Sequence, residues 1–251
     1  MQRSIANKWI KPNSIFYFLG IILIFIIWHV ASVIIDNEII LPTISQTFTA
    51  LFDILSLEKT YTIILSTFGK LIIAVLISLV VSLTLVIFST LSSKFENLIK
   101  PLMTLLKTIP VAAIIILLLI VVGNTNSPYI VTLLVILPIM YESILMGVKT
   151  IDQSIINALK IDSSLNLKVM LKIHLPLSFP YILTSIIQSL GLGLKVMVMA
   201  EFLAQPNNSI GKQILFYKEM LEIPYVFAWT LILISFILVV DFFLKKIKVH
   251  K

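Results

Sequence analysis

The chain has 251 residues, of which 59% are hydrophobic and only 12% are charged, and its mean hydropathy is +1.09. Soluble globular domains are about 45–50% apolar and about 25% charged, so this composition excludes an ordinary soluble enzyme, a disordered protein and a nucleic-acid module. The net charge is +7 and there is no cysteine, which excludes disulfides and cysteine metal sites. The apolar runs are far longer than the ~10-residue alternating strands of an outer-membrane barrel. We therefore predict an all-α integral membrane protein.

Six apolar segments are each close to the ~20 residues that a helix needs to cross the hydrocarbon core. In chain order they are 15–35, 71–91, 102–122, 129–148, 179–203 and 225–244. Lys107 and Pro110 interrupt the third segment, and the short stretch 123–128 after it predicts a tight turn. We expect a single membrane domain over 1–251, made of a cytoplasmic segment 1–14, a six-span core 15–245 and a cytoplasmic tail 246–251.

The distribution of basic residues predicts the orientation of these segments. Lysines and arginines concentrate at both termini, in the connection between segments two and three, and in the connection between segments four and five. The connections on the other side carry acidic residues beside their few lysines. Because cytoplasmic loops carry an excess of Lys and Arg, we expect the N- and C-termini to be cytoplasmic.

The connection between segments one and two contains a repeating apolar pattern. Apolar residues recur there at nearly helical spacing: Ile44, Phe48, Leu51, Phe52 and Leu55. Such a pattern predicts an amphipathic helix that lies on the outer membrane interface.

The connection 149–178 is too long to be a simple link between two spans. Ile155, Ile156 and Leu159 form an apolar stripe, and 165–174 fits a second helix, which Pro176 and Pro180 are expected to end. A short amphipathic helix outside the bilayer docks either on the membrane surface or on a partner protein. The pattern alone favours neither.

This connection resembles the cytoplasmic signature of ATP-binding cassette (ABC) importer permeases, which reads E-A-A, three residues, G, nine residues, I-x-L-P. With the same spacing, the signature falls on Asn157, Ala158, Leu159, Ser163, Ile173, Leu175 and Pro176. Four of these positions match. Asn157, Leu159 and Ser163 depart from the signature, where the family has Glu, Ala and Gly.

Other stretches, in the same order and over about 15–245, resemble the nitrate/sulfonate/taurine-type permease family. They are Leu41-Pro42-Thr43, Thr67-Phe68-Gly69-Lys70, Lys100-Pro101 with Ile109-Pro110-Val111-Ala112-Ala113, Ala200-Glu201 and Ile210-Gly211. Each is a weak signal, and their common order and spacing make the resemblance strong.

The resemblance implies the permease subunit of an ATP-driven importer in the bacterial cytoplasmic membrane. Such a subunit lines the path of a small polar solute, for which anionic and vitamin-precursor-like compounds are candidates. It pairs with a second permease copy, two cytoplasmic ATP-binding subunits and an extracytoplasmic substrate-binding protein. It is not an enzyme and binds no cofactor, because ATP and Mg belong to the partner; the chain has no G-x-x-x-x-G-K-[ST] loop.

Carried over to this sequence, the resemblance implies a cytoplasmic coupling helix between segments four and five that contacts the ATPase. The implied coupling residues are Ile155, Ile156, Asn157, Ala158, Leu159, Ser163, Ile173, Leu175 and Pro176.

Glu142, Lys195 and Glu201 are candidate path residues, because a charge in or near a span is costly and often functional. Lys195 follows Gly191 and Gly193, which allow helices to approach closely. Its ammonium is expected to line the outer vestibule, to extend to the interface or to pair with Glu201. The three histidines are dispersed and suggest no metal site.

A stand-alone secondary transporter is the alternative reading. It would predict inverted repeats and broken helices with charges at the middle of the membrane. No clear repeat is visible in the sequence, and this alternative leaves the 149–178 connection unexplained.

Overall fold

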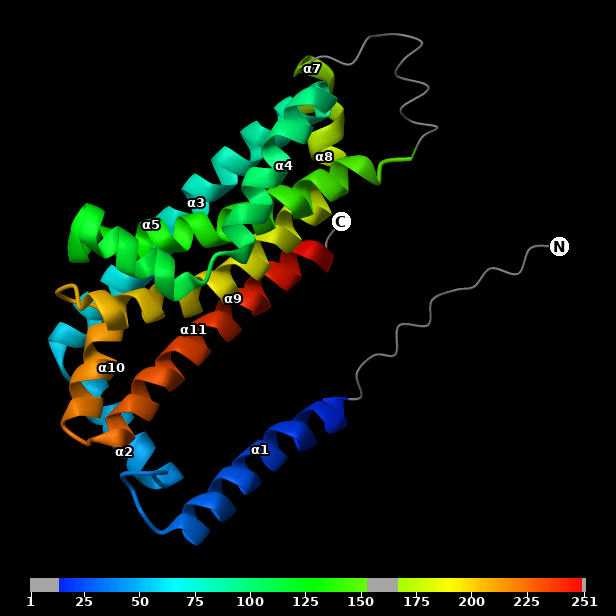
Figure 1. Cartoon of the computed structure of the whole chain (residues 1–251). Coiled ribbons are helices and arrows are strands. Elements are labelled where there is room, and N and C mark those ends of the chain that lie inside the picture. The colour runs from blue at the N-terminus through cyan, green and yellow to red at the C-terminus, as the bar shows by residue number, and fades with distance from the viewer. Residues whose placement is uncertain (1–13, 153–166, 250–251) are drawn as a thin grey trace.

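The computed structural model describes residues 14–152 and 167–249, and every regular element in those two ranges is a helix (Figure 1). In chain order they are α1 (Ser14–Ile35), α2 (Ile44–Ser56), α3 (Glu58–Leu91), α4 (Ser93–Thr108), α5 (Val111–Lys149), α7 (Leu167–Val169), the π-helical turn η1 (Met170–His174), α8 (Leu175–Leu177), α9 (Phe179–Ala204), α10 (Ile210–Glu219) and α11 (Ile223–Val249).

Five helices in this part of the chain are long and apolar enough to cross a membrane. The qualifying stretches are Phe18–Ile35, Glu58–Leu91, Val111–Lys149, Phe179–Ala204 and Ile223–Phe242. They confirm an integral membrane protein. The sixth crossing stays a prediction, because the predicted third segment is not one helix.

The predicted third segment, 102–122, is divided between α4 and α5. Ile109 has extended backbone angles (φ −66°, ψ 129°), and α5 begins only after Pro110. A residue before proline is disfavoured in a helix, and proline itself has no N–H to donate. α4 also begins earlier than predicted, because the hydroxyl of Ser92 accepts the Phe95 N–H and caps the helix at Ser93.

The predicted turn between segments three and four is shorter than the expected 123–128. α5 contains the end of segment three and all of segment four, and its helical geometry is broken at Gly123 (φ 78°, ψ 175°). Such angles are essentially restricted to glycine, so one residue is enough to redirect the chain. Figure 1 shows that α5 is bent sharply between its two arms.

The predicted amphipathic helix after segment one is confirmed as α2. Its first turn is closed by a reciprocal capping box, in which Thr43 Oγ1 accepts the Gln46 N–H (3.3 Å) and Gln46 Oε1 accepts the Thr43 N–H (2.9 Å). The helix buries Thr47, Ala50 and Ile54 and leaves Phe52 exposed. The backbone N–H groups of Thr43 and Gln46, which have no partner within the helix, are thus hydrogen-bonded at the start of α2.

The core lies between α3, α5 and α9, and α11 adds Trp229 to it. Leu71, Ile136 and Met197, one from each of the three helices, are fully buried. Gly193 lies at this contact, where an added Cβ would lie 3.0 Å from Leu71 Cδ1. Close packing at Gly193 is therefore confirmed. Gly191 has open space around it instead.

α1 contacts the rest of the chain mainly through its C-terminal half. Only 6% of its membrane-crossing stretch is buried, against 50% for α5. Trp28 Nε1 donates to Pro42 O (2.9 Å), and the Trp28 ring lies 5.7 Å from the ring of Phe227. In Figure 1, α1 lies apart from the bundle along most of its length.

Candidate functional site

The predicted signature of the connection 149–178 lies partly outside the described residues. The six coupling residues that fall outside are Ile155, Ile156, Asn157, Ala158, Leu159 and Ser163. Ile173 lies in η1, and Leu175 and Pro176 lie in α8. Their contacts with an ATPase stay a prediction.

The chain passes from this signature to α9 through the π-helical turn η1. The Leu175 N–H donates to the carbonyl of Met170, five residues earlier. The helical path then continues through Pro176, so the prediction that Pro176 ends the helix is wrong. Pro176 has no N–H to donate, and it directly follows the wider hydrogen bonding of η1. Ser178 separates α8 from α9 and donates its hydroxyl to His174 O (2.8 Å).

Met170 and His174 anchor this segment. Both side chains are buried, whereas Ile173 and Leu175 are half-buried. Met170 belongs to a buried apolar cluster with residues of α3, α4 and α5: Val86, Met103, Leu137, Tyr141, Ile144, Leu145 and Val148. The sequence signal that was missed is the i, i+4 spacing of Met170 and His174, which places both on one helix face.

Glu201, near the end of α9, is the centre of a second site. Its side chain is fully buried, and both carboxylate oxygens lie 3.0 Å from Thr67 Oγ1 of α3. Oε2 also accepts the backbone N–H of Gly211 (3.2 Å), and Thr67 Oγ1 accepts the N–H of Ile210 (3.0 Å). A buried carboxylate is tolerated only where hydrogen bonds replace water, and this one has donors from two other helices.

The donors from Ile210 and Gly211 are the first N–H groups of α10. These groups have no partner within the helix, and the helix dipole favours a negative charge beside them. Close approach is possible because residue 211 is glycine: an added Cβ would lie 2.4 Å from the Phe202 nitrogen and 2.6 Å from the Val198 carbonyl oxygen. Glu201 therefore binds the start of α10 tightly to α9.

The other end of α10 packs against α11, which in turn contacts α2. The rings of Tyr217 and Tyr225 are stacked at 4.7 Å, and the Tyr225 hydroxyl donates to Asp53 Oδ2 (3.1 Å). Burial, with a smaller effect of Glu222, raises the pKa of Tyr217 above its usual value. α10 is thus held at its start by α3 and α9 and at its other end by α11.

Three of the short motifs in the sequence meet at Glu201. The threonine of Thr67-Phe68-Gly69-Lys70, the acid of Ala200-Glu201 and both residues of Ile210-Gly211 form a single hydrogen-bonded junction. Sequence reasoning found the three motifs but not their contact, because Thr67 and Glu201 are 134 residues apart.

Lys195 lies on a different face of α9 from Glu201. It is exposed and lines a groove of about 660 Å³ between α9 and α11, whose other lining residues are apolar except for Thr230 and Gly191. The carboxylate of Glu201 contacts Thr67 and Gly211, and the structure does not bring Lys195 to it. A path-lining role stays a prediction for both residues.

Glu142, the third candidate path residue, lies in the second arm of α5. Its carboxylate pairs with Lys107 of α4 (N–O distance 2.6 Å), and both side chains are nearly half exposed. Glu142 also lines a small cavity of about 270 Å³ between α4 and α5.

The apolar helices and the buried polar junctions define a multi-pass membrane protein, and comparison with known families gives its class. Residues 86–248, well over half of the chain, match the family described as binding-protein-dependent transport system inner membrane component. The chain belongs to this family, whose members are permease components of ABC transporters rather than enzymes. In general, such permeases work with an ATPase and a substrate-binding protein.

Two curated relatives carry the same name, glycine betaine/proline betaine transport system permease protein ProW. The protein of Escherichia coli (strain K12) is 26% identical over 139 residues, and that of Salmonella typhimurium (strain LT2) is 24% identical over 139 residues. Each match covers 55% of this chain and 39% of the relative. The nitrate/sulfonate/taurine subtype is not shown by these matches.

We predict that the Glu201 junction stabilises the fold. Thr67→Val keeps the side-chain shape but leaves the Ile210 N–H unpaired and removes a donor from Glu201. An unsatisfied buried polar group costs about 1–3 kcal/mol, so the free energy of unfolding should fall by about this amount in thermal or denaturant unfolding of the purified protein in detergent.

Thr62→Val is the matched control on the same helix. The Thr62 side chain is exposed, and its hydroxyl donates only to the Lys59 carbonyl of its own helix (2.7 Å). Thr67→Ser, which retains a hydroxyl, should remain close to the unmodified protein. An equal loss in Thr62→Val and Thr67→Val would contradict the role of the junction.

Proposed function

We propose that this chain is the membrane-spanning permease subunit of an ATP-driven ABC importer, which forms the path of a small polar solute and couples to a separate ATPase. The observation that carries the proposal is the signature frame in the connection 149–178, in a chain that belongs to the permease family. The end of this connection supports the role, because Met170 packs against α3, α4 and α5. A segment so attached can transmit a movement to the spans.

The proposed complex contains two permease copies, two ATP-binding subunits and a substrate-binding protein on the other side of the membrane. The connection 149–178 is called the coupling segment below. ATP-driven closure of the ATPase pair would move the coupling segments of both permease copies inward and change the side to which the path opens. Asn157 in place of the family's glutamate makes its contact with the ATPase a neutral hydrogen bond, which is about half as strong as a charged one.

The solute is proposed only by class. The sequence motifs favour a nitrate/sulfonate/taurine-type importer, whereas the two relatives are named for betaines. All of these solutes are small and polar. Lys195, in an otherwise apolar groove, supports a solute with a negatively charged group.

We further propose six crossings with both termini in the cytoplasm, α4 and the first arm of α5 together forming the third. The chain has no native cysteine, so Ser163→Cys and Asn207→Cys can each carry a single label. We expect a membrane-impermeant maleimide to label Asn207→Cys in intact cells and Ser163→Cys only after permeabilisation. Labelling of both positions in intact cells would contradict this topology.

We predict that the coupling segment determines assembly with the ATPase. Ile156→Asp would bury a charge in the docking surface, which is strongly unfavourable without a partner, so the ATPase should no longer co-purify with the tagged permease. Asn157→Glu is the matched control: it also adds an acid but restores the family residue, and it should retain or increase co-purified ATP hydrolysis. Undiminished ATPase binding by Ile156→Asp would show that the coupling assignment is wrong.

The charge of Lys195 provides a test of the solute class. A lysine in a span costs about 2.5–3.5 kcal/mol at the helix centre and less near the interface. Lys195→Met keeps the apolar stem and removes the charge. If the ammonium attracts an anionic group, uptake of labelled taurine or nitrate should fall while permease abundance and ATPase association hold, and Lys195→Arg should restore part of the uptake. If the ammonium only extends to the interface, uptake should be unchanged.

A further inference from the structure

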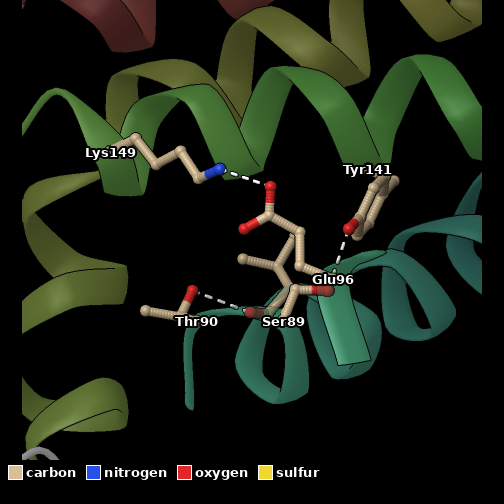
Figure 2. A network of polar contacts seen from close by, with 6 residues as sticks. Ser89, Thr90, Glu96, Tyr141 and Lys149 are labelled. Atoms are coloured by element: carbon tan, nitrogen blue, oxygen red, sulfur yellow. Dashed lines mark hydrogen bonds and ion pairs between the residues drawn. The ribbon is translucent and has the colours of Figure 1, made fainter. Parts of the chain in front are cut away.

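The ends of α3, α4 and α5 beside the coupling segment are joined by polar contacts (Figure 2). Lys149, the last residue of α5, forms an ion pair with Glu96 in the first turn of α4. The hydroxyls of Ser89 and Tyr141, both buried, are 2.8 Å apart and join α3 to α5.

A second ion pair joins the same two helices further from the coupling segment. Lys107, in the last turn of α4, pairs with Glu142 of α5 at 2.6 Å. Glu142 and Lys149 are about two turns apart, so they lie on one face of α5. In each helix the acidic residue comes before the basic one in the sequence. The two ion pairs can therefore form together only when α4 and α5 are antiparallel and aligned in this register.

The ion pairs are not the main source of adhesion between the helices. The four charged side chains are 26–51% exposed, and pairs so exposed contribute little stability. Adhesion comes from the apolar cluster beneath them, to which Met103 of α4 and Val148 of α5 contribute. Apolar contacts are non-directional, whereas the paired charges specify how α4 lies on α5.

On both sides of the coupling segment, the chain joins the packed ends of α3, α4 and α5. The chain leaves α5 at Lys149, whose ammonium holds α4, and returns at Met170, which belongs to the apolar cluster. A force applied to the segment therefore reaches α3, α4 and α5 together, provided that α4 does not slide along α5.

We infer that Glu96–Lys149 and Lys107–Glu142 are positioning contacts that make the inner ends of α4 and α5 move as one body when the ATPase moves the coupling segment. The inference rests on the proposed function, because it requires an ATPase partner. It assigns these four residues to the transmission of movement, a role separate from the predicted role of Glu142 in the solute path.

A distance measurement in this cysteine-free chain tests the inference. Spin labels at Leu98→Cys on α4 and Met146→Cys on α5, both exposed positions, report the α4–α5 distance in the complex with its co-purified ATPase. The distance is compared without nucleotide and with MgATP plus vanadate. We expect one narrow distribution that is the same in both states.

Reversing the charge of one partner in the Glu96–Lys149 pair should let α4 move relative to α5. Reversing both partners should fix α4 on α5 again. In Lys149→Glu, two acids face each other, and we expect the distance to broaden and to differ between the states by about 1–2 Å, the size of helix shifts in switching proteins. Glu96→Lys with Lys149→Glu restores an opposite pair and should restore the narrow distribution. Lys149→Met, which adds no repulsion, provides the same comparison if Lys149→Glu does not fold.

Lys94→Glu is the matched control. Lys94 is exposed on the first turn of α4, and its reversal changes the charge of that turn by the same amount without breaking either ion pair. The inference is overturned if the distance changes between states in the unmodified background, if single and double reversals behave alike, or if Lys94→Glu has the effect of Lys149→Glu. If no ATPase co-purifies with the unmodified permease, the proposed function itself is contradicted, and the inference with it.

Discussion

The fully buried carboxylate of Glu201 is the constraint on which the arrangement of one end of the molecule depends. Charge inside an apolar bundle must be matched by donors, and here the donors come from the hydroxyl of Thr67 and the first turn of α10. This requirement fixes α3, α9 and α10 against one another, and it fixes the rotation of α9. Once Glu201 faces inward, Gly193 must face α3 and α5, and Lys195 faces the groove beside α11.

The opposite end of the bundle is held together by different physics. There, half-exposed ion pairs lie over an apolar cluster, and the buried polar contacts between α3 and α5 are made by hydroxyl groups, as in the Ser89–Tyr141 pair and the bond from Ser82 to the Leu137 carbonyl. Exposed ion pairs exchange partners and water at little cost in free energy, whereas the Glu201 junction cannot open without leaving several buried groups unpaired. The Glu201 end is therefore fixed by buried hydrogen bonds, whereas beside the coupling segment the apolar cluster holds α4 on α5 and the paired charges specify its register.

Periodicity and hydropathy were sufficient to predict what depends on neighbouring residues. They located α2 and α9 closely, and they separated the apolar segments. The interruption at Pro110 and a turn after residue 122 were predicted, but hydropathy did not show that Pro110 separates two helices or that Gly123 alone makes the turn, because an average does not register a missing N–H or a positive φ. The Glu201 junction could not be predicted as a contact, since nothing local indicates that residue 67 will face residue 201. Met170 was missed for a similar reason: its partners come from three other helices.

The loose attachment of α1 has a consequence for how the protein adapts to its membrane. With 22 residues, α1 is about 33 Å long, slightly more than the ~30 Å hydrocarbon core. A helix longer than the bilayer is thick relieves the mismatch by tilting. Because α1 is tied down near Trp28 and packs on little else within this chain, it can change its tilt without disturbing the packed core. Variation in lipid thickness would thus be absorbed by the first helix.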